Sequence, residues 1–230
     1  MNSPNVGVDS VYYEAQDKLG LVGAVIVRAR RRMLDDFLAM TAAGPADTIL
    51  DIGVSDVITD EANFLERRYP YRSNITCVGL GDGAAVLAAY PGIAYRQIAP
   101  DQALPFADQS FAIATCNAVL EHVGDDAHRR AMIADMLRVA RRVFIAVPNR
   151  WFPVEHHTAV PLLHFWPGLF RAACRAIGKG YWADPANLEF LSPSRLVGLF
   201  PPGVAVTFRH SGIPLGPFSS NLVCVAAAAS

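Results

Sequence analysis

The stretch TILDIGVSDVITDEANFLERRYP, residues 48–70, carries the pattern on which the fold prediction depends. An apolar run of strand length ends at Gly53, and a segment with helical spacing follows near residues 60–69. Strands that alternate with helices are typical of an α/β protein with a parallel sheet. A loop that holds a nucleotide-like cofactor normally continues with more glycine, which lets the backbone approach the ligand. Here Val54 and Ser55 follow the single glycine instead.

The same alternation continues to about residue 148. The predicted strands are 48–53, 75–81, 93–98, 111–117 and 143–147, and the predicted helices lie near 60–69, 83–90 and 125–140. Beyond them we expect a helix near 161–177 and another that Ser192 caps, with Pro193 at its first position. The last two predicted strands, 204–210 and 221–228, are joined by a connection too short for a crossover helix, so they should be antiparallel.

The N-terminal region predicts a helix with one buried face. Apolar residues recur there at spacings of three or four, namely Val22, Ile26, Ala29, Met33, Phe37 and Met40. The basic cluster of Arg28, Arg30, Arg31 and Arg32 is then mostly the solvated side of this helix, in preference to a membrane or RNA contact.

Composition favours one soluble, cytoplasmic domain over residues 1–230, with a helical cap at 1–45 and a substrate-side insertion at 148–200. No apolar run approaches the roughly 18 residues of a membrane span, and the start of the chain shows no targeting signal. The formal net charge of -1 gives no general attraction to nucleic acid. The four cysteines form no C-x-x-C pair, which argues against a zinc cage or a disulfide framework.

In an open α/β sheet, ligands bind beyond the carboxyl ends of the strands, where the strand order reverses. The segments that directly follow predicted strands are therefore the candidate site. They are residues 53–56, 81–83, 99–102, 117–122 and 148–158.

Four elements together resemble class I S-adenosylmethionine-dependent methyltransferases: ILDIG, then LPFADQSF, then NAVLEHV, then a strand ending VPN. The resemblance covers roughly residues 20–228. It implies a Rossmann-like, doubly wound, seven-stranded α/β sheet in the order 3-2-1-4-5-7-6 with strand 7 antiparallel. It also implies S-adenosylmethionine as the cofactor and a small-molecule acceptor, methylated at oxygen or nitrogen more readily than at carbon. The segment PNRWFPVEHHTAVPLLHFWP is similar to one in a bacterial subgroup associated with glycan or other small-metabolite modification.

The resemblance also implies which residues would contact the cofactor. In the family, the loop after strand 1 passes under the methionine part, an acid ending strand 2 holds the ribose, and an acid after strand 3 meets the adenine. Carried over, these roles fall on Asp51, Gly53, Val54 and Ser55, on Gly81 and Asp82, and on Asp101 and Gln102. After strand 4, Asn117, Glu121 and His122 would line the cofactor's amino acid end or the acceptor pocket, although Glu121 and His122 could equally begin the loop before the next helix.

This chain departs from the family pattern in the cofactor region. The glycine loop keeps only Gly53, the position of the ribose acid is Gly81 with Asp82 one place later, and Asp101 follows Pro100. Ala112 stands where an aspartate is common. The departures predict a cofactor loop with a different path.

Catalytic candidates come from the segment after the fifth strand. Glu155, His156 and His157 lie on the expected acceptor side, and a neutral imidazole is suited to accept a proton near pH 7. An equally open interpretation is a hydrogen-bonded loop that fixes the next helix. A metal site made of these residues and His164 is disfavoured, because their spacings match no familiar zinc pattern. His164 should pack on its helix.

Several alternatives stay open at this point. The aromatic residues could roof a substrate cavity, or more simply pack in the core or a lid: Tyr12, Tyr13, Trp151, Phe152, Phe165, Trp166 and Trp182. A non-catalytic binding or scaffold protein with the same fold is the alternative function. A nicotinamide oxidoreductase is disfavoured because G-x-G-x-x-G does not follow the first strand.

Overall fold

The computed structural model describes residues 20–58, 62–155, 157–158, 160–216 and 218–227, and side chains from residue 27 onward. Its centre is a seven-stranded sheet in the order β3-β2-β1-β4-β5-β7-β6. Strands β1 to β5 pair in parallel, while β7 is antiparallel to both β5 and β6. The strands are β1 Ile49–Ile52, β2 Ile75–Gly79, β3 Ala94–Gln97, β4 Phe111–Asn117, β5 Ala140–Pro148, β6 Val206–Leu215 and β7 Phe218–Ala227. The predicted fold class and strand order are confirmed.

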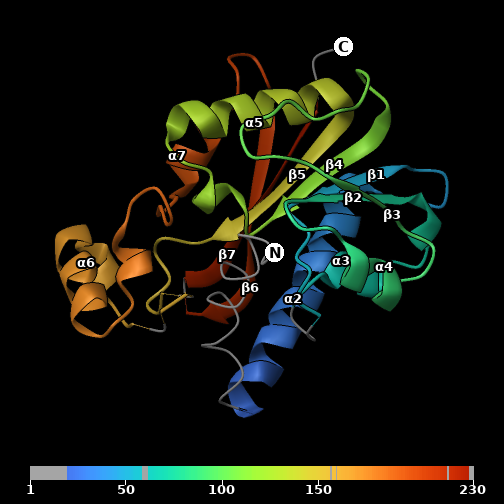
Figure 1. Cartoon of the computed structure of the whole chain (residues 1–230). Helices are drawn as coiled ribbons and strands as arrows, with labels where there is room; N and C mark the ends of the chain where they lie inside the picture. Colours follow the sequence, from blue (N-terminus) through green and yellow to red (C-terminus); the bar gives the residue numbers. More distant parts are fainter. Residues whose placement is uncertain (1–19, 59–61, 156, 159, 217, 228–230) are drawn as a thin grey trace.

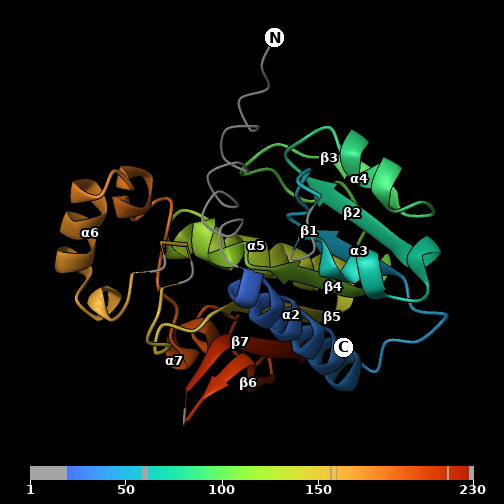
Figure 2. The same cartoon turned by 90° about the horizontal axis from the view of Figure 1, so that it is seen from below.

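Helices cover both faces of this sheet (Figures 1 and 2). One face carries α5 and α7, and the other carries α2, α3 and α4. A separate group containing α6 lies to the side of the sheet, over a small apolar cluster of its own. The helices are α2 Gly20–Thr41, α3 Phe64–Arg68, α4 Ala84–Ala89, α5 Asp126–Val139, α6 Pro167–Ala176 and α7 Pro193–Val197, with 3-10 turns η1 Arg72–Asn74, η2 Leu120–His122, η3 Leu163–Phe165 and η4 Gly180–Ala183.

The central strands are apolar on both faces because helices cover both. Along β5, Val143 and Ile145 pack toward α5, while Phe144 packs toward α2, where it meets the ring of Phe37 edge to face at 5.2 Å. Successive side chains of a strand point to opposite faces, so one continuous apolar run supplies both cores. That is the pattern expected of a parallel sheet buried on two sides.

The N-terminal helix buries the predicted face, since Ala29, Met33 and Phe37 are all buried. Val22 and Ile26 lie outside the residues whose side chains are described. Of the arginines, three are exposed as expected, but Arg30 is half-buried and faces the central cavity. The basic cluster is thus mostly the solvated side of the helix, as predicted, and Arg30 is the exception.

Two predicted elements differ from the observed ones. The helix expected at 161–177 is instead a short turn, η3, followed by α6, because Pro167 has no amide hydrogen and suits the first turn of a new helix. The last two strands are longer than predicted and form a hairpin, so most of the supposed connection is strand.

All four cysteines are buried, and each is a free cysteine. None of the helices in the described part of the chain is long and apolar enough to cross a membrane.

Candidate functional site

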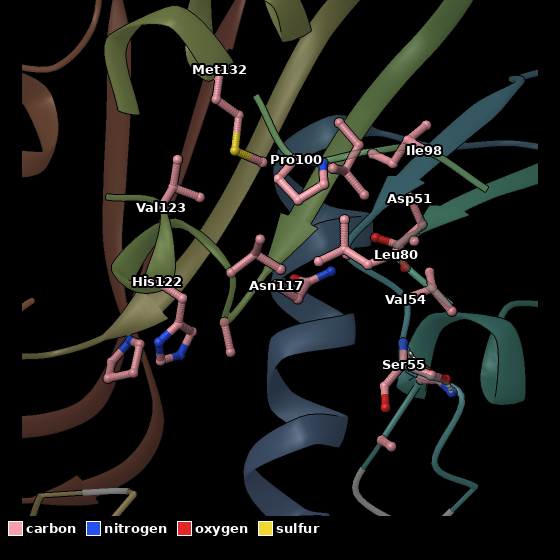
Figure 3. A pocket seen from close by; sticks show the side chains of 18 of the residues that line it. Asp51, Val54, Ser55, Leu80, Ile98, Pro100, Asn117, His122, Val123 and Met132 are labelled. Carbon is pink, nitrogen blue, oxygen red and sulfur yellow. Dashed lines mark hydrogen bonds between the residues drawn. The ribbon is translucent and has the colours of Figure 1, made fainter. Parts of the chain in front are cut away.

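A cavity of about 1330 Å³ opens at the carboxyl ends of the parallel strands. Small-ligand pockets usually occupy roughly 300–1000 Å³, so this one has room for two small ligands. Its walls include the segments after β1, β2, β3, β4 and β5, which confirms the expected location. Figure 3 shows Asn117 between Asp51 on one side and His122 on the other.

The loop after β1 makes its hydrogen bonds within the protein. Gly53 and Val54 both donate their amides to the carbonyl of Val78, at 2.8 and 3.1 Å, and the Ser55 amide donates to the side chain of Asn63 at 3.2 Å. Asn63 in turn donates to the Ser55 carbonyl at 2.7 Å. Gly53 takes a φ of 85°, which favours glycine. These three amides therefore have acceptors within the protein, although Gly53, Val54 and Ser55 all line the cavity.

A carboxylate nevertheless lies at the end of β2, and it comes from the neighbouring loop. A Cβ added to Gly81 would overlap the carboxylate of Asp56. Within the described residues, Asp56 Oδ1 is buried and accepts no hydrogen bond. Asp56 thus occupies the space that a side chain at position 81 would take, and the absence of a side chain there is what makes room for it.

Asp51 forms a buried pair with Glu66 of α3 beneath the cavity. Burial, and then the neighbouring Glu66 carboxyl, raise the pKa of Asp51 well above its usual range. Cys77 donates to Glu66 Oε1 at 3.3 Å, and burial followed by the charge of Glu66 raises the pKa of this thiol. Two carboxyls cannot both stay ionised cheaply in a shared buried site, so the raised pKa of Asp51 favours its protonated form.

The residues predicted to meet ribose and adenine separate into two groups. Gly81, Asp101 and Gln102 line the cavity, and Asp101 adopts a left-handed φ of 58°, which aspartate tolerates better than most residues. Asp82 is not among the lining residues. It is exposed and accepts a hydrogen bond from the Ala84 amide at 3.0 Å, at the start of α4.

Three predicted residues follow β4. Asn117 and His122 line the cavity, whereas Glu121 lies behind them with 1% of its surface exposed. Burial raises the pKa of Glu121 to about 7, although the neighbouring His157 opposes this. The 187–189 segment orients the His122 ring, because His122 Nδ1 lies 2.6 Å from the carbonyl oxygen of Asn187. Burial, and then His157, lower the pKa of His122.

The segment after β5 presents a carboxylate and an imidazole. Glu155 Oε1 lies 2.7 Å from His157 Nδ1, and Oε2 accepts from the amide and hydroxyl of Thr158 at 2.6 and 2.5 Å. Burial acts to raise the pKa of Glu155, but the hydrogen bonds from His157 and Thr158 hold it at about 2. Glu155 and His157 both line the cavity, while His156 lies outside the described residues. The geometry suits both the catalytic and the loop-fixing interpretations.

The segments after β4 and β5 contact each other through the imidazole rings of His122 and His157. The rings of His122 and His157 lie 4.9 Å apart, edge to face, and the buried Trp182 ring lies 4.7 Å from that of His157. One potential ligand atom from each of Glu121, His122 and His157 lies within 4.8 Å of the others. Spacing could not reveal this cluster, because it joins residues from separate loops.

The remaining aromatic predictions have mixed outcomes. Phe152 is buried and lines the cavity, but Trp151 and Trp166 are exposed, and Tyr12 and Tyr13 fall outside the described residues. His164 is buried in η3, with Nε2 3.0 Å from the Arg150 carbonyl oxygen. Sequence reasoning missed Arg30, Asn63 and Glu66, because each lies on a helix or loop whose pattern indicates only packing.

Solved methyltransferases share this architecture. The chain is similar to a SAM-dependent methyltransferase from Thermotoga maritima, with 16% identity, 96% of this chain and 99% of that chain covered, and a TM-score of 0.57. It is also similar to one from Methanosarcina mazei, with 18% identity, coverages of 83% and 96%, and a TM-score of 0.56. It is similar as well to one from Mesorhizobium loti, with 14% identity, coverages of 84% of this chain and 96% of that chain, and a TM-score of 0.54.

Sequence comparison adds no closer relationship, since no family model matches the chain and no curated protein matches it. At these identities the likeness concerns the fold. The strand order, the antiparallel β7 and the cavity at the carboxyl ends all agree with it. The chain has the fold of the class I SAM-dependent methyltransferases.

Proposed function

We propose that this protein transfers a methyl group from S-adenosylmethionine to oxygen or nitrogen of a small molecule. The observation that carries the proposal is the cavity, which lies at the reversal point between β1 and β4 and is large enough for a cofactor and an acceptor together. S-adenosylmethionine, when bound, supplies a methyl group on a sulfonium that an acceptor displaces in line. The protein then has to bind the two ligands, align them and exclude water from them.

The residues at the cofactor end fit an adenosine in an altered way. We propose that Asp56 replaces the acid missing at position 81 and accepts hydrogen bonds from the ribose hydroxyls. Its buried oxygen has no hydrogen bond to any described residue, and a buried carboxylate needs such partners. Asp101 and Gln102, which line the cavity beyond β3, would face the adenine.

The amino acid end of the cofactor also has a fitting contact. Arg30 of α2 faces the cavity together with Asn117. The positive charge of Arg30 suits the carboxylate of the methionine moiety, and the buried side-chain oxygen of Asn117 suits its ammonium group.

The acceptor end is the wall formed by Glu155, His157 and His122. The ionised Glu155 accepts from His157 Nδ1, so the opposite nitrogen, Nε2, carries the lone pair that could accept a proton. We propose that this wall receives the nucleophilic group of the acceptor. Phe152 lines the cavity and the buried Trp182 packs against His157, so this wall suits a small acceptor.

Calorimetric titration with S-adenosylhomocysteine and S-adenosylmethionine tests the proposal. We expect one site per chain, and we expect Asp56→Asn to weaken binding about tenfold to a hundredfold, because a hydrogen bond to a charged group contributes roughly 1.5–3 kcal/mol. Asp82→Asn is the matched control, since Asp82 is exposed and its carboxylate accepts from the Ala84 amide, whereas Asp56 Oδ1 is buried beside the cavity-lining Gly81. If neither ligand binds at millimolar concentration, the proposal is contradicted.

One observation favours a non-catalytic binding or scaffold protein instead. The amides of Gly53, Val54 and Ser55 all donate to acceptors within the protein, as a site that no longer binds a cofactor would allow. The same titration separates the two, because a ligand specific to the folded state must stabilise it. A melting temperature that does not change with cofactor supports the scaffold.

A further inference from the structure

We propose that Glu121, His122 and His157 form a binding site for a divalent transition-metal ion in the wall of the cavity. Each residue offers a ligand atom within 4.8 Å of the other two. Imidazole and carboxylate together suit ions such as Zn²⁺, Co²⁺ and Mn²⁺. The chemical class of the site is two imidazoles and one carboxylate, with a further position facing the cavity.

Glu121 is the first reason for this proposal. Its side chain is buried, yet neither carboxylate oxygen accepts a hydrogen bond from any residue that the structure describes. Buried carboxylates are normally paired, hydrogen-bonded or bound to a metal. The nearby Arg129 does not supply the missing partner, because it bonds to the Leu120 and Gly124 carbonyls and to Asp126.

The orientation of the two imidazoles is the second reason. A carbonyl oxygen can only accept, so His122 Nδ1 must donate to Asn187 at 2.6 Å. His157 Nδ1 likewise donates to the carboxylate of Glu155 at 2.7 Å. In both rings the proton is on Nδ1, and Nε2 is the atom with a lone pair for a metal. Metal-binding histidines are typically oriented in this way by a carbonyl or a carboxylate.

The geometry is close to that of a three-residue site. His122 Nε2 lies 3.8 Å from Glu121 Oε1. An ion at the centre of an equilateral triangle with the longest allowed side would lie roughly 2.8 Å from each atom, against about 2.0–2.2 Å for zinc bonds to nitrogen and oxygen. Side-chain movements of less than about 1 Å therefore complete the shell.

The surroundings hold this arrangement in place. The Glu189 amide donates to the Glu121 carbonyl at 3.0 Å, which ties the 187–189 segment to η2. Trp182 is buried against His157 and shields one side of the cluster. His122 and His157 both line the cavity, so a fourth ligand would come from that side. Three protein ligands with one open position are typical of catalytic rather than structural metal sites.

The consequence for chemistry rests on the proposed function. An ion here would bind the hydroxyl oxygen of the acceptor and lower its pKa, so that the proton leaves to water. The oxygen then forms a bond to the methyl carbon as the carbon–sulfur bond breaks, and the bonding electron pair stays on sulfur. This assigns the acceptor class as a hydroxyl compound, and it makes His157 a metal ligand in place of a general base.

Titration of the chelator-treated, untagged protein with Co²⁺ and Zn²⁺ tests the site without any cofactor. We expect one ion per chain, with the visible absorption bands of Co²⁺ bound to nitrogen and oxygen. Glu121→Gln and His157→Asn should each weaken binding about a hundredfold or more, and Glu155→Gln about tenfold to a hundredfold, as for partners of metal ligands. His128→Gln is the matched control, because its Nδ1 also contacts a carboxylate, Asp125 at 2.7 Å, but no further ligand joins it.

The experiments distinguish failure of the metal site from failure of the proposed function. Absence of saturable one-to-one binding by the wild-type protein overturns the metal site, as does equal affinity in folded Glu121→Gln and His157→Asn variants. Cofactor binding is measured in the presence of chelator, so its loss would overturn the proposed function alone. Methyl transfer that persists unchanged in chelator would show that His157 acts without an ion.

Discussion

The two ends of the cavity each contain buried carboxyls, but the groups around them differ. At the cofactor end, Asp51 lies against Glu66. At the acceptor end, Glu121 lies beside the imidazoles of His122 and His157. The first arrangement favours a shared proton, whereas the second favours a shared cation. The comparison shows that burial alone does not assign a role to a carboxyl, because the neighbouring groups decide which partner it takes.

The largest effect is expected at the proposed cofactor end, from a substitution that introduces a second carboxylate beside Asp56. Gly81→Asp should lower affinity for S-adenosylhomocysteine about a hundredfold, because the new side chain overlaps the Asp56 carboxylate. It should also destabilise the fold by about 1–3 kcal/mol through overpacking. Calorimetry and thermal unfolding measure the two effects.

The double variant Gly81→Asp with Asp56→Ala sharpens this test. Gly81 has no left-handed φ that would strain an aspartate, so the new acid should take over the vacated space and restore much of the affinity. Affinity that stays as low as in the single variant would show that Asp56 does not replace the missing acid.

A smaller effect is expected at the acceptor end in the absence of metal. Glu121→Gln removes a buried carboxylate that lacks hydrogen bonds from the described residues, so it should raise the free energy of unfolding of chelated protein by about 1–3 kcal/mol. With saturating Zn²⁺ the order should reverse, because the ion binds the wild-type protein more tightly and therefore stabilises it more than the variant. Denaturant unfolding with and without Zn²⁺ measures both differences, and the same order under both conditions would contradict a metal site.

The smallest expected effect concerns pH. Because the folded-state pKa of Asp51 is raised, the folded protein holds more protons than the unfolded chain above the ordinary aspartate value of about 4. Stability is therefore lost as pH rises from that value toward the folded pKa. Asp51→Asn removes this loss, so its advantage in melting temperature should grow from pH 5 to pH 8.

Asp82→Asn controls for the loss of one negative charge at an exposed position. A difference between Asp51→Asn and the wild type that stays constant with pH, or that shrinks as pH rises, would remove the distinction between the two ends of the cavity.

Local sequence was a good guide where an element depends on its own residues. The apolar runs of β1, β4 and β5 predicted buried parallel strands. The helix predicted at 125–140 is α5, where the Asp125 side chain accepts from the Ala127 and His128 amides. The break before α6 was less visible because Pro167 interrupts an otherwise helical pattern. The full hairpin of β6 and β7 was hidden by the glycines and prolines of its turn.

The amino-acid sequence by itself determined the layered α/β architecture and the edge of the sheet where the cavity opens, because alternation of apolar runs and helix signals is a property of neighbouring residues. Only the tertiary structure decided how the site is composed. Asp56 fills the space beside Gly81, Glu66 reaches Asp51 from another element, and His157 meets Glu121 and His122 across two loops. Such contacts depend on how separate segments pack, and no spacing within one segment encodes them.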